Sequence, residues 1–304
     1  MRVSNTHFFD QAVTQMNRQQ SSIAELQLKI GEGKQLMRAS DDPNKAMVIQ
    51  RLNSAVQTQM VFESTLNAVD NRLLLEESSL DTMNDIMLRL KEIAVQGTNG
   101  TLSDVDRNLL ATEVNSLRDS LFSLANTQDA NNNYIFAGSS TGSPAFSEVS
   151  GSISYAGDDV RITVDVSDHR QLVLNRPGDQ IFTNVTRRGP PETEVSFFDA
   201  IDEFSAALVS GSNDALQQGL SDIGSLTDVS INALADLGSR QNTANTQREI
   251  VMDTKLRFQQ LLSSEEDLDY AAAVTELSAE MMSLEAAQAS FAQISALSLF
   301  NYIR

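Results

Sequence analysis

Apolar side chains recur every seven residues near the start of the chain. This spacing predicts a helix with a narrow coiled-coil seam. The other positions are rich in Gln, Asn, Ser and Thr, so the stripe buries too little apolar surface to hold the helix alone, and a partner helix is expected. The repeat consists of Phe9, Met16, Ile23, Ile30 and Met37, with Val13 and Leu26 on the same face.

The last forty residues carry a similar pattern. Leu277, Leu284 and Phe291 are spaced by seven, and Val274, Met281 and Ile294 lie beside them. The run Ser263-Ser264-Glu265-Glu266-Asp267 provides the side chains that favour a helix start. The two thin seams at opposite ends of the chain are complementary, and we expect them to pair with each other.

Between the ends, the pattern predicts long helices. Ser40, Asp41 and Asp42 are capping residues, and Pro43 suits a first helical turn, so a helix is expected to start near residue 43. Two interleaved heptad rows then run for over fifty residues without Gly or Pro, until the turn signal at 97–100. A further apolar stripe over 110–124 predicts a helix that packs back as an antiparallel hairpin.

The pattern of hydrophobic and polar residues changes at about residue 131. Alternation over Val160–Val166 and at Ile153 and Tyr155 predicts half-buried strands, and the sequence Gly157-Asp158-Asp159 between them predicts a hairpin. Helical character resumes at Phe197 and continues through a further heptad row. We therefore predict a mainly α fold, a long antiparallel coiled-coil or helical-bundle rod with a small β-rich insert. Its parts are 1–42 with 264–304, 43–130 with 195–263, and the insert 131–194.

The composition of the chain argues against several classes of function. The 22 Lys and Arg residues against 41 Asp and Glu residues give a net charge of −19, which opposes binding to nucleic acid or to an anionic membrane surface. There is no Cys, which excludes disulfides and thiolate chemistry. His7 and His169 stand in unrelated contexts, and the Asp104-x-Asp106-x-Asn108 spacing lacks the rest of a calcium loop. The acidic run at 265–269 is better explained by a helix start than by a metal site. We predict no catalytic residue, cofactor or metal.

Paired terminal helices have a consequence for assembly. A stalk of two helices presents its remaining faces to neighbouring copies, and such contacts are heterologous. Heterologous contacts that do not close generate helical assemblies, so the pattern is typical of a polymer subunit.

Several segments carry a resemblance to the bacterial flagellin-family axial proteins. They are the opening Met1-Arg2-Val3-Ser4-Asn5-Thr6, the stretch from Gly33-Lys34 to Ser40-Asp41-Asp42-Pro43, the motif Tyr134-Ile135-Phe136-Ala137-Gly138, the weaker match Leu237–Asn242, and the end from Glu266-Asp267 to Tyr302-Ile303-Arg304. Flagellins usually have alanine and glycine after the paired aspartates. Here Pro43, Asn44 and Lys45 follow, which favours a hook-filament junction protein of the family over a filament flagellin.

The resemblance implies a structural adaptor that joins the hook, through another hook-associated protein, to the flagellin filament. It implies an extracellular location in the flagellum, export without a cleavable signal peptide, an export chaperone, and a helical ring of copies. It also implies that the terminal helices form the inner tube and supply the assembly interface, namely Phe9, Met16, Ile23, Ile30, Leu277, Leu284, Phe291 and Ile294. Alternatives are a filament-forming flagellin and, less favoured, a chemoreceptor-like signalling coiled coil.

Overall fold

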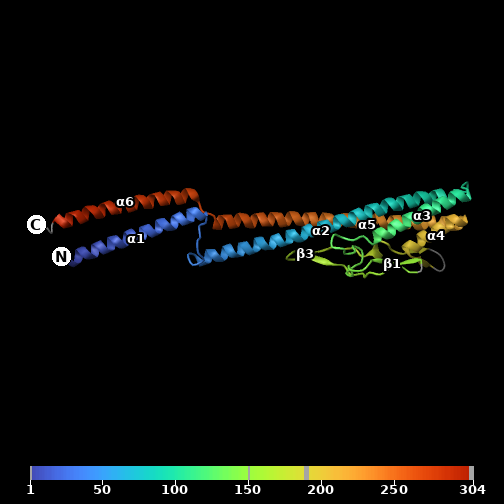
Figure 1. The fold of residues 1–304 in the computed structure, drawn as a ribbon, viewed down its shortest axis with the longest axis horizontal. Coiled ribbons are helices and arrows are strands. Elements are labelled where there is room, and N and C mark those ends of the chain that lie inside the picture. The colour runs from blue at the N-terminus through green and yellow to red at the C-terminus, as the bar shows by residue number, and fades with distance from the viewer. Residues whose placement is uncertain (1, 150, 188–191, 301–304) are drawn as a thin grey trace. The chain divides into compact units, whose positions relative to one another are not determined.

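A computed structural model describes residues 2–149, 151–187 and 192–300 (Figure 1). The last four residues of the C-terminal family match lie outside them. The described chain contains six α-helices and a few short antiparallel strand pairs, which confirms the mainly α fold. It forms two compact units: a terminal unit of Met1–Thr58 with Asp253–Arg304, and a central unit of Gln59–Met252. The three-part division expected from the sequence stays a prediction.

The terminal unit contains α1 (Arg2–Glu32), α6 (Tyr270–Phe300), the start of α2 (Pro43–Gly97) and the end of α5 (Asn213–Glu266). Helix α2 starts at Pro43 as the sequence predicts. Asp42 provides the cap, because its Oδ1 accepts hydrogen bonds from the backbone N–H groups of Asn44 (3.1 Å) and Lys45 (3.0 Å). The helix start is therefore encoded locally.

The start of the last helix differs from the expectation. Ser263–Glu266 belong to the end of α5, and α6 begins only at Tyr270, where Asp269 Oδ1 accepts a hydrogen bond from Ala272 N (3.1 Å). Between the helices the chain pairs with the segment after α1: Gln35 N donates to Glu266 O (2.8 Å) and Leu268 N donates to Gly33 O (2.9 Å). This pairing with a distant segment sets the boundary, so the local capping signal was misleading.

In the central unit, α2 and α3 (Asp104–Ala125) form the expected antiparallel hairpin (Figure 1). Arg89 of α2 contacts Glu113 of α3 through two hydrogen bonds of 2.7 and 3.2 Å. Ser103 caps α3 by accepting a hydrogen bond from Asp106 N, and Asp104 and Asp106 lie in the first turn of this helix. Both heptad rows of α2 are buried here, at Leu66, Val69, Leu73, Leu80, Met83, Met87 and Leu90.

Helix α4 (Phe197–Ser210) and α5 are separate, whereas the sequence suggested one continuous helical stretch. Gly211 adopts a φ of +65° and its N–H bonds to Ala207 O, which ends α4 in the left-handed conformation that glycine favours. Helix α4 packs on α3, and α5 starts again at Asn213.

A buried ion pair interrupts the apolar heptads of α2 and α5. Glu76 occupies the position between Val69 and Met83 in one row, and it is only 2% exposed. Arg240 of α5 donates to both of its carboxylate oxygens. Burial opposes the charge of Arg240, but the hydrogen bond and charge of Glu76 prevail and raise the pKa of Arg240. Heptad periodicity identifies position 76 as internal without revealing its partner.

The described residues of the insert form three two-stranded antiparallel sheets. The strands are β1 (Phe146–Val149) with β2 (Ser152–Tyr155), β3 (Thr163–Ser167) with β4 (Arg170–Val173), and β5 (Val185–Arg187) with β6 (Thr193–Val195), and a 3₁₀ turn η1 covers Gly178–Gln180. The prediction of a hairpin at residues 157–159 is wrong. Strand β2 pairs with the preceding strand β1, and β3 pairs with the following strand β4, so β2 and β3 do not pair with each other.

The stretch at 157–159 serves as an anchor in place of a turn. The carboxylate of Asp158 accepts hydrogen bonds from Ser139 N (2.7 Å), Ser139 Oγ (2.6 Å) and Ser140 Oγ (2.9 Å). Its Oδ1 also accepts from Val160 N (3.1 Å). These bonds tie the chain after β2 to the loop at 138–140, which keeps β2 away from β3.

The Asp158 anchor predicts an acid-sensitive insert. The hydrogen bonds, chiefly from the Ser139 side chain, lower the pKa of Asp158 to about 2. Its stabilisation is therefore present above the unfolded-state pKa of about 3.9 and is lost as the pH falls through about 2. We expect Asp158→Asn to flatten the decline in stability between pH 4 and 2, measured by urea unfolding at each pH. Asp159→Asn is the matched control and should keep the wild-type decline; equal profiles for all three proteins would contradict the assignment.

Candidate assembly interface

The helices at the two ends of the chain pack against each other in antiparallel fashion (Figure 1). The rings of Phe9 and Phe291 meet edge to face, with centroids 5.4 Å apart and an interplanar angle of 89°. Further along, Gln19 Nε2 donates to Ser283 Oγ at 2.9 Å. The structure thus brings together the two seams that the sequence picked out separately.

The Phe9–Phe291 contact sets the register of the whole pair. Both helices repeat their apolar residues every seven positions, and they run in opposite directions. Stepping one heptad along each helix from this contact places Met16 level with Leu284, and a second step places Ile23 level with Leu277. The two seams therefore match along their length.

The pair buries little of its own surface. Seven of the eight residues expected at the assembly interface are half-buried: Phe9, Met16, Ile23, Ile30, Leu277, Leu284 and Phe291. Ile294 lies outside this seam and is exposed. Among the described side chains of α1 and α6, only Leu26 and Ala273 are classed as buried. An isolated two-helix pair with so small a core is marginal in water.

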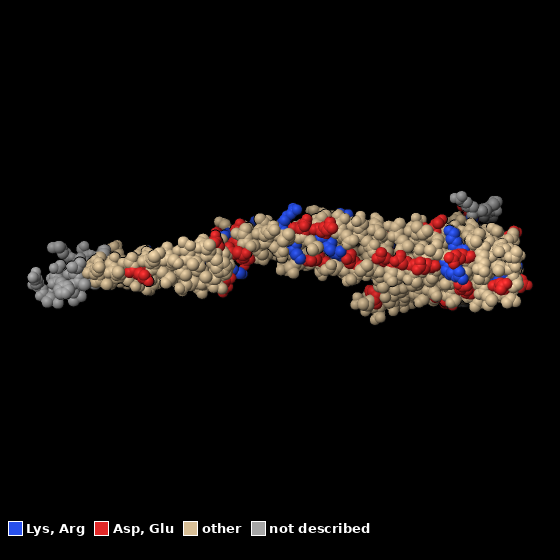
Figure 2. All heavy atoms as spheres, turned by 90° about the horizontal axis from the view of Figure 1, so that it is seen from above, with Lys and Arg blue, Asp and Glu red and all other residues tan. Residues whose placement is uncertain are grey.

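Apolar side chains also point away from the seam. They include Leu28 on α1 and Val274, Met281, Met282 and Ile294 on α6, and Met282 is 65% exposed. Val13 is 43% exposed, so it differs from Leu26, with which the sequence placed it on the seam face. Figure 2 shows that the visible face of these two helices carries very little charge. Several exposed apolar side chains in a region of low charge are typical of a protein–protein contact region.

The C-terminal end of α1 packs closely against the start of α6, and this contact region is called the α1–α6 junction. Gly33 ends α1 with a φ of +72°, and Lys34 contacts Glu266 at 2.5 Å. That hydrogen bond raises the pKa of Lys34. A Cβ on Gly33 would lie 2.6 Å from Tyr270 Oη, so both the backbone conformation and the space require glycine.

Gly33 and its neighbour Gly31 are expected to respond oppositely to alanine. Gly33→Ala should destabilise the junction by about 1–2 kcal/mol, because an L-residue is strained in the left-handed region. Gly31 lies within α1 and has no atom near its missing Cβ, so Gly31→Ala should stabilise α1 by about 0.5–1 kcal/mol. Native-state hydrogen exchange of the last turns of α1 measures both effects, and shifts of the same sign would refute this view of the junction.

The two family motifs have structural roles outside the seam. Asp41 Oδ2 accepts a hydrogen bond from Arg38 N (3.0 Å), and Asp42 and Pro43 start α2 as described; Ser40 Oγ approaches Asp41 at 3.4 Å. In the motif at 134–138, Ile135, Phe136 and Ala137 are buried and Tyr134 is partly buried. Gly138 has a φ of +70° and faces Asp158 so closely that a Cβ would meet its backbone oxygen.

Neither a metal-binding group nor a membrane-spanning helix is found in the described part of the chain. No group of three or more His, Asp or Glu side chains in it is arranged to hold a metal ion. His7 and His169 are exposed. Within the same residues, none of the helices combines the length and hydrophobicity needed to cross a bilayer.

Comparison with known proteins points to one family. Residues 3–141 match the family model described as the bacterial flagellin N-terminal helical region. Flagellar hook-associated protein 3 of Salmonella typhimurium is 29% identical over the whole of both chains, and the protein of that name from Escherichia coli is 29% identical over 99% of each. The chain is thus similar to the bacterial flagellin family over residues 3–141 and to flagellar hook-associated protein 3 over its full length. This family is a structural one of the bacterial flagellum.

Solved structures share the fold of this chain. FlgL of Xanthomonas campestris aligns with a TM-score of 0.63 at 23% identity, covering 71% of this chain and 99% of that one. The flagellar junction protein FlgL of Legionella pneumophila aligns with a TM-score of 0.62 at 19% identity, covering 74% and 100%. The resemblance drawn from the short motifs is therefore confirmed by similarity over the full chain.

Proposed function

We propose that the chain is a non-enzymatic adaptor that joins the flagellar hook to the flagellin filament. Its relatives of matching length carry the name flagellar hook-associated protein 3, and one protein of the same fold is called a flagellar junction protein. The adaptor contacts another hook-associated protein on one side, flagellin on the other, and copies of itself in a helical ring. It works outside the cell in the flagellum, which it reaches with the help of an export chaperone.

One observation carries the proposal: the terminal helices pair through a matched but thin seam and leave further apolar residues exposed. Leu26 and Ala273 supply the small core, whereas Leu28, Val274 and Met282 face outward. Since hydrophobic burial is the main favourable term in association, neighbouring subunits supply the surface that the pair lacks. We infer that assembly and the consolidation of the terminal helices are coupled, with the seam and Ile294 as the assembly residues.

Deletion of the gene tests the adaptor role. Cells without the protein should carry bare hooks in electron micrographs and should release flagellin into the medium, and the wild-type gene should restore filaments. Normal filaments on the hooks of the deletion strain would overturn the proposal.

A filament-forming flagellin is the second candidate, because flagellins also match the chain; that of Listeria monocytogenes is 26% identical over 86% of it. Purified protein added to filament seeds separates the two. An adaptor should add a short layer at most, whereas a flagellin should grow long filaments. Long growth would replace the first proposal by the second.

A further inference from the structure

Strand β2 of the insert pairs with β1 on one side and has no neighbouring strand on the other among the described residues. In an antiparallel pair, every second residue turns its backbone N–H and C=O away from the partner strand. Phe146 of β1 does so, because its N–H donates to Asn126 Oδ1 and its C=O accepts from Asn126 Nδ2, both at 3.0 Å. Tyr155 lies opposite Phe146, so Tyr155 and, two residues earlier, Ile153 turn their backbone groups away from β1.

The outward backbone groups of Ile153 and Tyr155 make no hydrogen bond within the described residues. Unpaired groups on an edge strand are a template for another strand, and proteins usually protect such edges with Lys, Pro or a bulge. The sequence of β2 is Ser-Ile-Ser-Tyr, and its register with β1 is regular. None of these protective features is present, so the edge is open to strand addition.

A groove of about 480 Å³ opens beside this edge. All four residues of β2 line it, whereas β1 contributes only Phe146, so the groove follows the free edge and not the face of the hairpin. The other side of the groove consists of residues 182–184 and the start of α4. Ser152 Oγ donates to Asp199 Oδ1 at 3.2 Å and joins the two sides at one point.

The groove is acidic. Its lining residues include Asp179 and Asp199 but no Lys, Arg or His. Within the described residues, Asp179 makes no hydrogen bond or ion pair, and its Oδ1 is buried. The carboxylate of Asp199 has only the Ser152 hydroxyl as a partner in the same part of the chain. Unbalanced negative charge beside an unpaired strand edge favours an extended segment with a positive side chain.

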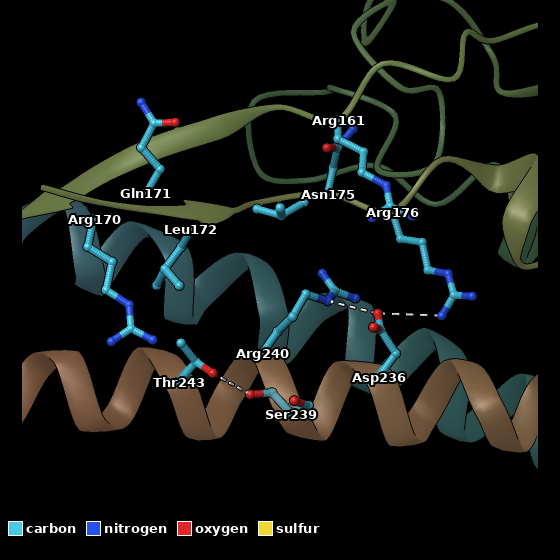
Figure 3. A pocket seen from close by; sticks show the side chains of 11 residues that line it. Arg161, Arg170, Gln171, Leu172, Asn175, Arg176, Asp236, Ser239, Arg240 and Thr243 are labelled. Carbon is cyan, nitrogen blue, oxygen red and sulfur yellow. Dashed lines mark hydrogen bonds and ion pairs between the residues drawn. The ribbon is translucent and has the colours of Figure 1, made fainter.

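Ion pairs hold both sides of the groove in place. Arg118 of α3 contacts Glu148 of β1 at 3.1 Å and Asp202 of α4 at 3.2 Å, so it links the strand side to the helix side. Arg176, which follows β4, lies 3.5 Å from Asp236 of α5 and fixes the insert at a second place (Figure 3). The groove is therefore formed before any partner enters, which reduces the entropy lost on binding.

We propose that this groove binds an extended protein segment, which adds to β2 as an antiparallel third strand and places a Lys or Arg beside Asp179 and Asp199. Ile153 and Tyr155 each form one closely spaced pair with the added strand. The backbone hydrogen bonds provide the affinity, and the two carboxylates select a basic segment. The site lies in the insert and does not depend on the adaptor role.

Residue-resolved hydrogen exchange of the full chain tests strand addition. The probe is the synthetic peptide acetyl-Thr-Val-Lys-Val-Thr-amide, which places β-branched residues around one lysine. With the peptide at saturation, the amides of Ile153 and Tyr155 should exchange more slowly by about tenfold or more. The amides of Ser152 and Ser154 already face β1 and should keep their rates.

Control peptides separate the strand edge from the charge. Fluorescence anisotropy of labelled peptides in low salt should give the lysine peptide a dissociation constant on the order of 0.1–1 mM. A peptide with proline in place of both valines keeps the lysine but cannot pair as a strand, so it should not bind measurably. A peptide with glutamate in place of lysine should bind about threefold more weakly or worse.

Protein variants locate the charge. Asp179→Asn removes one carboxylate with little change of shape, so it should weaken binding of the lysine peptide about threefold or more and keep the wild-type melting temperature. Asp168→Asn is the matched control, because Asp168 is exposed between β3 and β4 and does not line the groove. The proposal is overturned if the lysine peptide does not bind saturably, if it leaves Ile153 and Tyr155 unprotected, if the proline peptide binds equally well, or if Asp168→Asn weakens binding as much as Asp179→Asn.

Discussion

Leu284→Glu should abolish incorporation of the subunit into flagella. Leu284 lies in the middle of the α6 seam, level with Met16 of α1, and it is half-buried before any neighbour is added. A carboxylate there enters a contact region that provides no positive partner on α6, because Tyr270–Phe300 contains no Lys or Arg. An uncompensated buried charge costs several kcal/mol, on the order of 3–5, which exceeds what a marginal helix pair can offset.

The measurement has two parts. Hydrogen exchange of the purified variant should show faster exchange in α1 and α6 and unchanged protection in the central unit, which has its own core. In cells lacking the wild-type gene, the variant should fail to restore filaments.

Two controls make this result specific. Met282→Glu introduces the same charge two residues away on the exposed side of α6, so it should leave the exchange of α1 close to wild type. Leu284→Met keeps the volume and polarity of the seam and should restore filaments. Filaments built on a junction of the Leu284→Glu subunit would contradict the assignment of the seam to assembly.

Phe198→Ala should destabilise the central unit by about 3–5 kcal/mol, the usual cost of removing a buried aromatic ring. Phe198 is 1% exposed and lies at the start of α4. Its ring meets those of Phe122, Phe146, Phe182 and Phe197, at centroid distances between 5.2 and 6.3 Å. Because Phe146 and Phe182 belong to the insert, loss of this ring loosens the insert from the helices.

Urea unfolding followed by far-UV circular dichroism measures the loss, and hydrogen exchange locates it. Exchange should accelerate in β1, β2 and α4, whereas α1 and α6 should keep wild-type rates. Val105→Ala is the matched control: Val105 is 70% exposed, and its truncation should change stability by less than about 0.5 kcal/mol. A loss below about 1 kcal/mol for Phe198→Ala would show that the aromatic cluster is not the main link between insert and helices.

The helical part of this protein was predictable because its signals are local. A capping aspartate before Pro43 starts α2, the glycine-containing turn after residue 97 ends it, and Ser103 caps α3. Heptad spacing identified the buried rows of α2 and the seams of α1 and α6 before any partner was known. These features depend on residues within a few positions of one another, and backbone geometry translates that spacing directly into a helix face.

The insert was harder to predict because strand pairing is a choice between neighbours. Residues 152–155 pair as well in principle with the strand before them as with the strand after them. Gly151, with a φ of +87°, supplies the turn to β1, and the Asp158 anchor draws the following chain away. The choice rests on hydrogen bonds to Ser139 and Ser140, which no alternation pattern reveals.

By itself, then, the sequence determined the mainly α fold, the start and end of α2, the two terminal seams and the resemblance to the flagellin family. Tertiary structure alone decided that Phe9 meets Phe291 and that Glu76 meets Arg240 across 164 residues of chain. The physical reason is that periodicity records which side chains leave water, since burial depends on the face they occupy. It does not record which partner they meet, because that depends on how separate elements pack, and many pairings bury the same apolar surface.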